Sequence, residues 1–186
     1  MAPATYSAQE RLRDGQPIEI RALHPEDEAN MLAAVSRTGA KSRQRRFFVT
    51  KRGFSDAERE FFMKIDFVNH VALVAEIDEG GRPVIVGGCR YVVVEPDEAE
   101  VAFMVVDAYQ GKGIGLMLTR HLVGLARAAG LKQLAADVLP GNAAMRHVLE
   151  KLGFQTARSA DPQVVHLTLR LILGRSKRKQ ATPARV

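Results

Sequence analysis

The sequence predicts a single mixed α/β domain, with one mostly antiparallel sheet flanked by helices. The chain has 186 residues, about the length of one domain, and 46% of them are hydrophobic, which is enough for a core. Segments typical of strands alternate with segments of helical periodicity along the chain. Neither an internal repeat nor an interdomain linker interrupts this order, so all the strands are expected in one sheet.

The first elements are a strand and two helical segments. Residues 17–23 (PIEIRAL) alternate apolar and polar side chains, which is the pattern of a strand. Pro25 then begins a helix, and the three acidic residues after it suit the positive end of a helix dipole. Residues 41–48 (KSRQRRFF) are expected to form a second helix, with a basic outer face and an aromatic pair turned inward.

A third helix and a β-hairpin follow. Residues 55–65 begin with Ser55 and carry Glu58 three positions later, which is the capping box of a helix N-terminus. The segments 70–78 and 83–94 are β-rich and are joined by the turn EGGR. They are therefore expected to pair as a hairpin.

The second half alternates strands and helices. A strand leads through a glycine-rich loop into an amphipathic helix that ends before Gly130. A further strand precedes a helix that Asn142 caps and Gly153 closes. The expected strands are 98–106, 131–139 and 164–173.

The net charge of +6 is concentrated at the C-terminus. Residues 170–186 contain six basic residues and no acidic one, so the charges of the other 169 residues balance. We expect residues 1–174 to form the domain and residues 175–186 to be a solvated, disordered basic tail. The alternative is a tail that contacts nucleic acid, a membrane or an acidic protein.

Composition favours a cytoplasmic protein without metal. Cys89 is the only cysteine, which excludes a disulfide framework and suits a reducing compartment, where it is expected to pack in a strand. No apolar run approaches the roughly 18 residues of a membrane span, and the N-terminal residues lack the apolar stretch of a signal peptide. The five histidines show no metal-ligand spacing, so no metal is expected.

The stretch DAYQGKGIGLMLTRHL (107–122) places Gly111, Gly113 and Gly115 at alternate positions, directly before a helical pattern. Glycine costs a helix about 1 kcal/mol relative to alanine, so three glycines here need a reason. A helix N-terminus has unpaired N–H groups and a dipole that favours anions, and glycines let a phosphate approach the backbone. The alternative is a tight turn that requires positive φ, which a single glycine would usually satisfy.

Two familiar phosphate loops do not fit this stretch. The dinucleotide fingerprint G-x-G-x-x-G would need glycine at position 116 or 118, and both residues are leucine. A P-loop would need serine or threonine after Gly-Lys, but Gly113 follows Lys112.

The pattern Gln110-x-x-Gly113-x-Gly115 after the strand VAFMVV resembles that of the Gcn5-related N-acetyltransferase (GNAT) superfamily. The Asn142 helix and the closing LGF (152–154) agree with it, and the likeness covers nearly the whole chain except the tail. It implies the GNAT fold, acetyl-CoA as co-substrate, and a backbone that pairs with pantetheine and cradles pyrophosphate. The implied cofactor-binding residues are Phe103, Met104, Val105, Gln110, Gly111, Lys112, Gly113, Ile114, Gly115, Leu116 and Asn142. Lys112 could equally point into solvent, and Asn142 could serve only as an N-cap.

Transfer of an acetyl group to an amine needs a base and an oxyanion donor. The resemblance implies the N–H of Val105 as the donor. Glu100 is the expected base: it enters a strand whose following residues are apolar on both faces, and burial would raise its pKa. In the lysine-acetylating branch of the superfamily a glutamate on this strand has that role. The alternative for Glu100 is a solvated or arginine-paired acid, and Glu98 on the same strand face is the second choice for the base.

The general acid is missing from the expected position. Many members of the superfamily carry a tyrosine seven residues after the helix asparagine, and here that residue is Leu149. Either no protein acid is needed, because a CoA thiolate is a tolerable leaving group, or Tyr91 or Tyr109 substitutes from elsewhere.

The acceptor is suggested by two segments. Residues 42–48 (SRQRRFF) and 99–115 resemble the bacterial protein-lysine acetyltransferases that modify acyl-CoA synthetases. Those enzymes are often fused to a synthetase-like or nucleotide-sensing domain, for which these 186 residues have no segment. A lysine of an acyl-CoA synthetase is thus the implied partner, and neither a membrane nor nucleic acid is expected. The alternatives are a small-molecule amine acetyltransferase and a non-enzymatic acyl-CoA sensor whose basic tail contacts nucleic acid.

Overall fold

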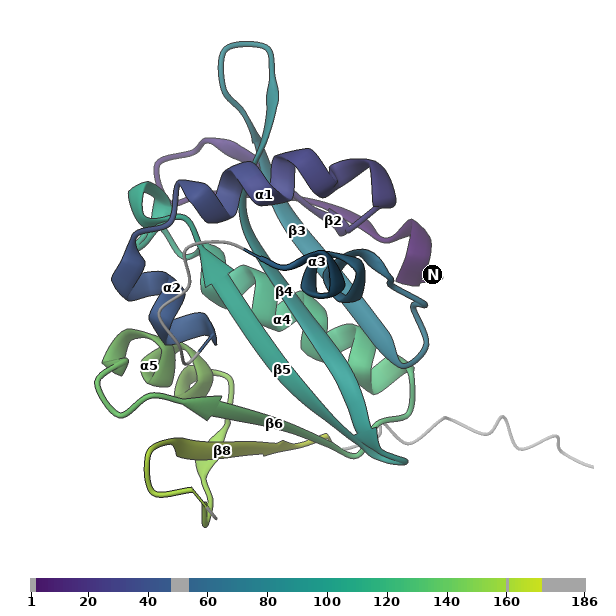
Figure 1. The fold of residues 1–186 in the computed structure, drawn as a ribbon, viewed down its shortest axis with the longest axis vertical. Helices are drawn as coiled ribbons and strands as arrows, with labels where there is room; N and C mark the ends of the chain where they lie inside the picture. The colour runs from purple at the N-terminus through teal and green to yellow at the C-terminus, as the bar shows by residue number, and fades with distance from the viewer. Residues whose placement is uncertain (1–2, 48–53, 160, 172–186) are drawn as a thin grey trace, which may run out of the picture.

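A computed structural model describes residues 3–47, 54–159 and 161–171, which contain one eight-stranded sheet (Figure 1). The strand order is β1-β2-β3-β4-β5-β6-β8-β7, and every neighbouring pair is antiparallel except β5 and β6. The strands are β1 (Ser7–Arg11), β2 (Pro17–Ala22), β3 (His70–Asp78), β4 (Pro83–Glu95), β5 (Glu98–Val105), β6 (Gln133–Val138), β7 (Gln155–Thr156) and β8 (Val165–Arg170).

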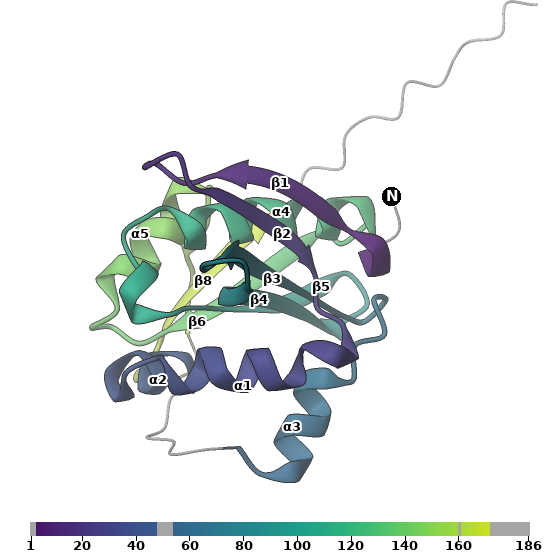
Figure 2. The ribbon, with the colours of Figure 1, turned by 90° about the horizontal axis from the view of Figure 1, so that it is seen from above.

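Helices cover both faces of the sheet (Figure 2). One face carries α1, α2 and α3 and the other carries α4 and α5, and we call these the α1–α3 face and the α4–α5 face. The α-helices are α1 (Glu28–Ser36), α2 (Ala40–Phe47), α3 (Asp56–Met63), α4 (Ile114–Ala128) and α5 (Ala143–Lys151). Short 3₁₀ turns are η1 (Pro3–Thr5), η2 (Pro25–Asp27) and η3 (Asp107–Tyr109). None of the helices in the described residues is long and apolar enough to cross a membrane.

The main core lies between the sheet and α4. Leu118 and Leu122 are fully buried there, in one cluster with Tyr91 and Phe103 of the central strands. A smaller cluster lies under α1, where Ala34 packs with residues of β3 and β4. Alternate residues of each central strand therefore face opposite layers, as the pleat of a sheet requires.

The pairing of β5 with β6 ends early and opens the sheet. Glu98, Ala99 and Glu100 pair with residues 133–135, and no pairing follows beyond Glu100 and Ala135. The two strands then separate, because β5 leads to η3 and α4 whereas β6 leads to α5 (Figure 1). We call this opening the fork.

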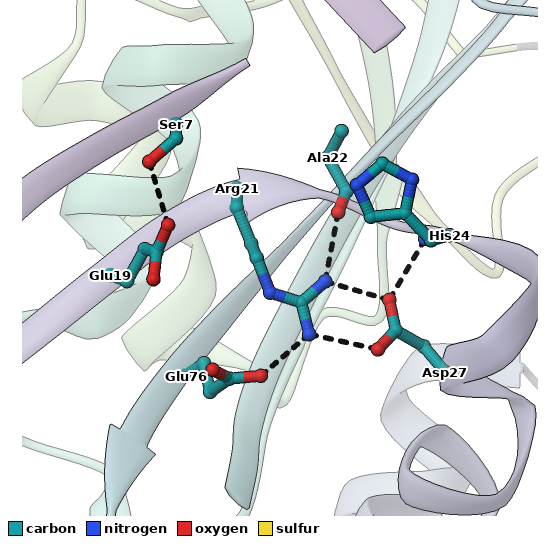
Figure 3. Close-up of polar contacts among 7 residues, drawn as sticks. All are labelled: Ser7, Glu19, Arg21, Ala22, His24, Asp27 and Glu76. Atoms are coloured by element: carbon teal, nitrogen blue, oxygen red, sulfur yellow. Dashed lines mark hydrogen bonds and ion pairs between the residues drawn. The ribbon is translucent and has the colours of Figure 1, made fainter. Parts of the chain in front are cut away.

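A polar network fixes the start of the helical layer against the sheet (Figure 3). The Arg21 guanidinium donates to both carboxylate oxygens of Asp27, at 2.7 and 2.8 Å, and to Glu76 at 2.5 Å. The N–H of His24 also donates to Asp27, at 2.8 Å. The bond to Asp27 is the main reason why the pKa of Arg21 is raised. Burial opposes ionisation of Asp27, but its bonds to Arg21 and His24 hold its pKa below the usual value. Strands β2 and β3 are thus joined to η2.

Most of the expected elements are confirmed. The hairpin of 70–78 and 83–94 is present as β3 and β4, and Ser55 and Glu58 form the expected capping box. Gly130 and Gly153 end α4 and α5 with φ of 84° and 91°. The helix expected at Pro25 begins as η2 and continues as α1.

Strand β1 was not expected. Four of its five residues are polar, and all are half-exposed or exposed. It is an edge strand whose neighbour in the sheet is β2, so its sequence carries little hydrophobic signal. Parts of three expectations lie outside the described residues: Phe48, the end of the strand expected over 164–173, and the basic tail 175–186 with the boundary before it.

Candidate active site

A cavity of about 480 Å³ lies at the fork. Its walls come from the separated part of β5, the loop before α4, the end of β6, and helices α2 and α5. It contains Glu100 and every expected cofactor-binding residue except Lys112. The fold thus brings together residues that are about 40 positions apart in the sequence.

The glycine loop forms the end of the cavity at the N-terminus of α4. Gly111 and Gly113 have φ of 78° and 93°, in the left-handed region that glycine adopts without strain. Gly113 is the N-cap of α4 and offers no side-chain cap, so the first N–H groups of the helix have no capping partner. Gly115 has no such φ, and a Cβ built on it would come no closer than 3.9 Å to Val105. The turn itself therefore explains Gly111 and Gly113. Gly115 is not required by the turn, and it leaves this part of the cavity wall without a side chain.

Strand β5 turns one backbone edge toward the cavity. The N–H of Val106 donates to Val86 of β4 at 2.9 Å. Backbone groups of successive strand residues point to opposite edges, so the N–H and C=O of Val105 point toward the fork. The C=O of Val105 accepts a hydrogen bond there from Gln110 Nε2 at 3.1 Å. The N–H of Val105 therefore points toward the fork, and its role as the oxyanion donor stays a prediction.

Helix α2 spans the fork from one arm to the other. On the β5 side, Gln110 Nε2 donates to Ser42 Oγ at 3.3 Å. On the β6 side, the Arg45 guanidinium donates to the C=O of Gly141 at 3.3 Å. The helix is thereby bonded to the loop before α4 and to the loop before α5, and it covers the α1–α3 face of the opening (Figure 1).

Glu100 is exposed, so the expected burial of this side chain is wrong. It is the last residue of β5 that pairs with β6, and the fork opens beside it, so no neighbouring strand covers its carboxylate. No hydrogen bond or ion pair engages this carboxylate among the described residues. Half-buried Arg46 of α2 lies close enough to interact with it electrostatically; burial lowers the pKa of Arg46 to about 10, and the charge of Glu100 opposes that shift. Glu98, the second choice, lies outside the cavity lining and accepts a hydrogen bond from Gln133 at 3.0 Å.

Neither tyrosine fills the missing acid position well. Tyr91 is fully buried in the core on the α4–α5 face and does not line the cavity, so its suggested role is wrong. Burial raises its pKa to about 12. Tyr109 lines the cavity, but its hydroxyl donates to Glu79 at the end of the β3–β4 hairpin. Leu149 is fully buried in the wall where the tyrosine would stand.

Two expected cofactor contacts are placed differently by the fold. Lys112 lies outside the cavity lining, because its ammonium pairs with Asp14 at 3.2 Å and lies over the Tyr109 ring. Asn142 lines the cavity and also caps α5, accepting from the N–H of Met145 at 3.4 Å. Its two suggested roles are therefore compatible.

The cavity also contains charged residues that sequence reasoning missed. Those on the wall are Arg13, Arg45, Arg46, Asp137, His147 and Lys151. Arg45 and Arg46 belong to the segment 42–48, for which no site role was expected, and the other four residues stand in no motif. Only the fold brings these segments together. Asp137 is the one acid of the expected strand 131–139, which is the weak signal that could have drawn attention to it. Among the described residues no group of three metal-ligating side chains occurs.

Known proteins match this chain over most of its length. A model of the acetyltransferase (GNAT) family matches residues 40–154. An acetyltransferase of Pseudomonas aeruginosa is 34% identical over 160 residues, which cover 84% of this chain and 86% of the relative. Acetyltransferase Pat of Mycolicibacterium smegmatis is 30% identical over 145 residues, which cover 77% of this chain and 43% of Pat. The chain thus spans less than half the length of that relative.

Solved structures share the fold. The GNAT domain of S. lividans PAT has a TM-score of 0.83 at 32% identity, covering 89% of this chain and 97% of that domain. A Salmonella typhimurium protein solved with acetyl-CoA has a TM-score of 0.68 at 19% identity, covering 86% of this chain and 96% of its own. The latter likeness concerns the fold alone. Together they confirm the expected architecture.

Proposed function

The chain belongs to the acetyltransferase (GNAT) family, and we propose that it transfers the acetyl group of acetyl-CoA to a primary amine, in the first place a lysine side chain of a protein. The observation that carries the proposal is the fork. Among the described residues it combines a strand edge that no other strand pairs, a helix N-terminus without a side-chain cap, and a carboxylate without a hydrogen-bond partner, all in one cavity.

The residues present fit the donor. The loop from Gly111 to Leu116 would hold the pyrophosphate, because the N–H groups at the start of α4 have no capping side chain and favour an anion. The edge of residues 103–105, which no strand of the described residues pairs on the fork side, would pair with the amide groups of the pantetheine arm as an added strand does. Arg13 and Lys151 on the wall add positive charge for the phosphates.

The chain's own groups supply the acid–base chemistry. Bound acetyl-CoA supplies a thioester, whose carbonyl carbon accepts the amine and whose sulfur leaves as a thiolate. Lysine has a pKa of about 10.4 and reaches the site as an ammonium, so Glu100 first takes one of its protons. Val105 N–H donates to the carbonyl oxygen as that oxygen gains charge, and one such donor contributes roughly 3 kcal/mol. A C–N bond forms, the C–S bond breaks, and the balance is one acetylated amine, one CoA thiol and one proton released.

A protein acceptor is supported by the relatives rather than by the cavity alone. Two similar proteins are named Pat, one a curated relative and one a solved GNAT domain. An acyl-CoA synthetase is the acceptor we propose to test first. The exposed position of Glu100 suits this, because a bulky acceptor reaches an exposed carboxylate more easily than a buried one.

The decisive experiment measures release of CoA thiol from acetyl-CoA with two acceptor sets, a panel of free amines and a purified acyl-CoA synthetase. Wild type is compared with Glu100→Gln, and Glu98→Gln serves as the matched control because it lies on the same strand face outside the cavity. We expect Glu100→Gln to lower kcat by about 10²-fold or more and to leave acetyl-CoA affinity unchanged, as calorimetry would show. The control should keep wild-type rates.

Other results would redirect the proposal. Release with free amines alone would make the protein a small-molecule acetyltransferase. Acetyl-CoA binding without release for any acceptor would favour the sensor, and deletion of residues 175–186 would then be expected to abolish partner binding. No acetyl-CoA binding at all would overturn the proposed site.

A further inference from the structure

A second carboxylate faces the fork from the opposite arm. Glu100 of β5 pairs directly with Ala135 of β6, and Asp137 lies two residues further along β6. Residues two apart on a strand share a face, so Asp137 and Glu100 both lie on the α1–α3 face. Both also line the cavity. The two acids thus flank the opening from its two arms.

Asp137 is held by a histidine on the next strand. His166 of β8 is its direct partner in the sheet, and His166 Nδ1 lies 2.7 Å from Asp137 Oδ1. The side chain of His166 is 27% exposed and that of Asp137 is 39% exposed, so a ligand can reach the pair although it is partly buried. Among the described residues no other side chain bonds to Asp137, which leaves its second oxygen for a partner in the cavity. His166 itself does not line the cavity.

The charges of the cavity wall indicate the chemistry that such a partner needs. The basic residues Arg13, Arg45, Arg46 and Lys151 suit a donor that carries several phosphates. Among the described residues, the cavity wall also carries two acids, Glu100 and Asp137. Their negative charges would repel the phosphates of the donor, so they suit a positively charged ligand instead. Arg45 bonds to the C=O of Gly141, and Arg46 interacts electrostatically with Glu100. Asp137 is therefore the carboxylate that remains for the incoming ammonium.

We propose that Asp137 binds the ammonium group of the acceptor opposite Glu100, and that His166 positions Asp137 for this contact. The inference rests on the proposed acetyl transfer. An ammonium has three N–H groups: Glu100 accepts the proton that must leave before attack, and Asp137 accepts a hydrogen bond from another. The C–N bond then forms as the C–S bond breaks. The site thereby selects acceptors that arrive charged.

The test compares Asp137→Asn, which keeps the shape and removes the charge, with Asp97→Asn. Asp97 pairs with Lys132 at 2.5 Å outside the cavity, so it is a matched surface control. With Nα-acetyl-lysine methylamide as acceptor, we expect Asp137→Asn to raise KM roughly tenfold or more and to change kcat much less. Asp137→Glu should recover part of the affinity, and acetyl-CoA affinity should stay at the wild-type value. Equal KM values for the Asp137 and Asp97 variants would overturn the proposal.

His166 is tested through the same KM. His166→Gln keeps an N–H that can donate to Asp137 and should stay near wild type, whereas His166→Ala should raise KM. Melting temperatures are recorded for every variant. If the KM values of these variants correlate with their melting temperatures, and not with whether residue 166 carries an N–H donor, the role of His166 is merely structural.

A binding measurement separates this inference from the proposed function. Calorimetry of the full chain with CoA present compares Nα-acetyl-lysine methylamide with its neutral analogue, Nα-acetyl-norleucine methylamide. If wild type transfers no acetyl group but binds the charged probe in a manner that Asp137→Asn abolishes, the ammonium site stands and the transfer proposal fails. If the two probes bind wild type with equal affinity, or if Asp137→Asn binds the charged probe as tightly as wild type does, the ammonium site is overturned even where acetyl transfer occurs.

Discussion

Asp107 joins the turn before α2 to the loop before α4. Its Oδ2 accepts a hydrogen bond from the N–H of Gly39 at 3.1 Å, and its Oδ1 accepts one from Gln110 at 3.0 Å. The helix that covers the fork and the loop that forms the end of the cavity are therefore held by one carboxylate. A change at this point should reach both the donor and the acceptor side.

Gly39→Ala should disturb this connection. A Cβ built on Gly39 would lie 2.6 Å from Asp107 Oδ2, so the carboxylate must move and its bonds to Gly39 and Gln110 are disturbed. We expect kcat/KM for acetyl transfer to fall by about 10- to 100-fold, because small displacements of positioning groups are costly. Gly124→Ala is the control: it lies in α4 with open space around its Cβ position, and it should gain roughly 0.5–1 kcal/mol of stability and keep its activity. A Gly39→Ala variant with wild-type kinetics would contradict the role of Asp107.

Asp27→Asn should destabilise the protein in a pH-dependent way. Asp27 is 7% exposed, and removing one member of a buried ion pair costs about 3–5 kcal/mol. Because the Arg21 side chain keeps 16% exposure, we expect roughly 2–3 kcal/mol at pH 7 from urea unfolding. The pKa of Asp27 is lowered by folding, so its contribution is full above the unfolded value near 3.9 and disappears as pH falls through the lower folded value. The difference between variant and wild type should thus shrink in acid. Asp97→Asn, which breaks a surface pair, should cost no more than about 1 kcal/mol.

His70 should make the protein less stable in mild acid. Burial, and next the charge of Arg90, lower the pKa of His70 to about 4, so it stays neutral in the fold. In the unfolded chain its pKa is about 6.5, so between pH 6.5 and 4 the unfolded state binds a proton that the folded state does not. Stability should therefore fall as pH is lowered through this window, by up to about 3 kcal/mol. Melting temperatures at pH 7 and pH 5 measure it. His70→Gln should flatten the dependence, and an unchanged slope would assign it to other groups.

Cys89 should be inert while the protein is folded. It is 4% exposed, and burial raises the pKa of its thiol well above the usual value. The thiolate is the reactive form, so we expect no alkylation by iodoacetamide under native conditions and complete alkylation in denaturant. Mass spectrometry gives the extent of labelling. Rapid native labelling would show that the strand opens at this point.

Much of the fold and of the donor side was predictable because its signals are local. Ser55 with Glu58 is a capping box whatever surrounds it, and Gly111 and Gly113 occupy left-handed positions that the loop itself requires. The Gln110 pattern after an apolar strand was enough to predict the family, which is confirmed. Short-range spacing thus predicted the main strands and helices of the second half along the chain, and the helix N-terminus at the cavity.

The acceptor side depended on contacts that spacing does not encode. Glu100 was expected to be buried from its apolar neighbours, but it is exposed because β5 and β6 stop pairing at that residue. The contact between Asp137 and His166, 29 residues apart, exists because β6 and β8 are neighbours in this register, and the bond from Arg45 to Gly141 exists because α2 crosses the fork. The sequence by itself determined most of the elements, their caps and the glycine loop, since these follow from the preferences of neighbouring residues, but it did not predict the edge strands β1 and β7. The tertiary structure alone decided which charges meet at the fork, since that depends on where two strands separate and on which distant segments the sheet places side by side.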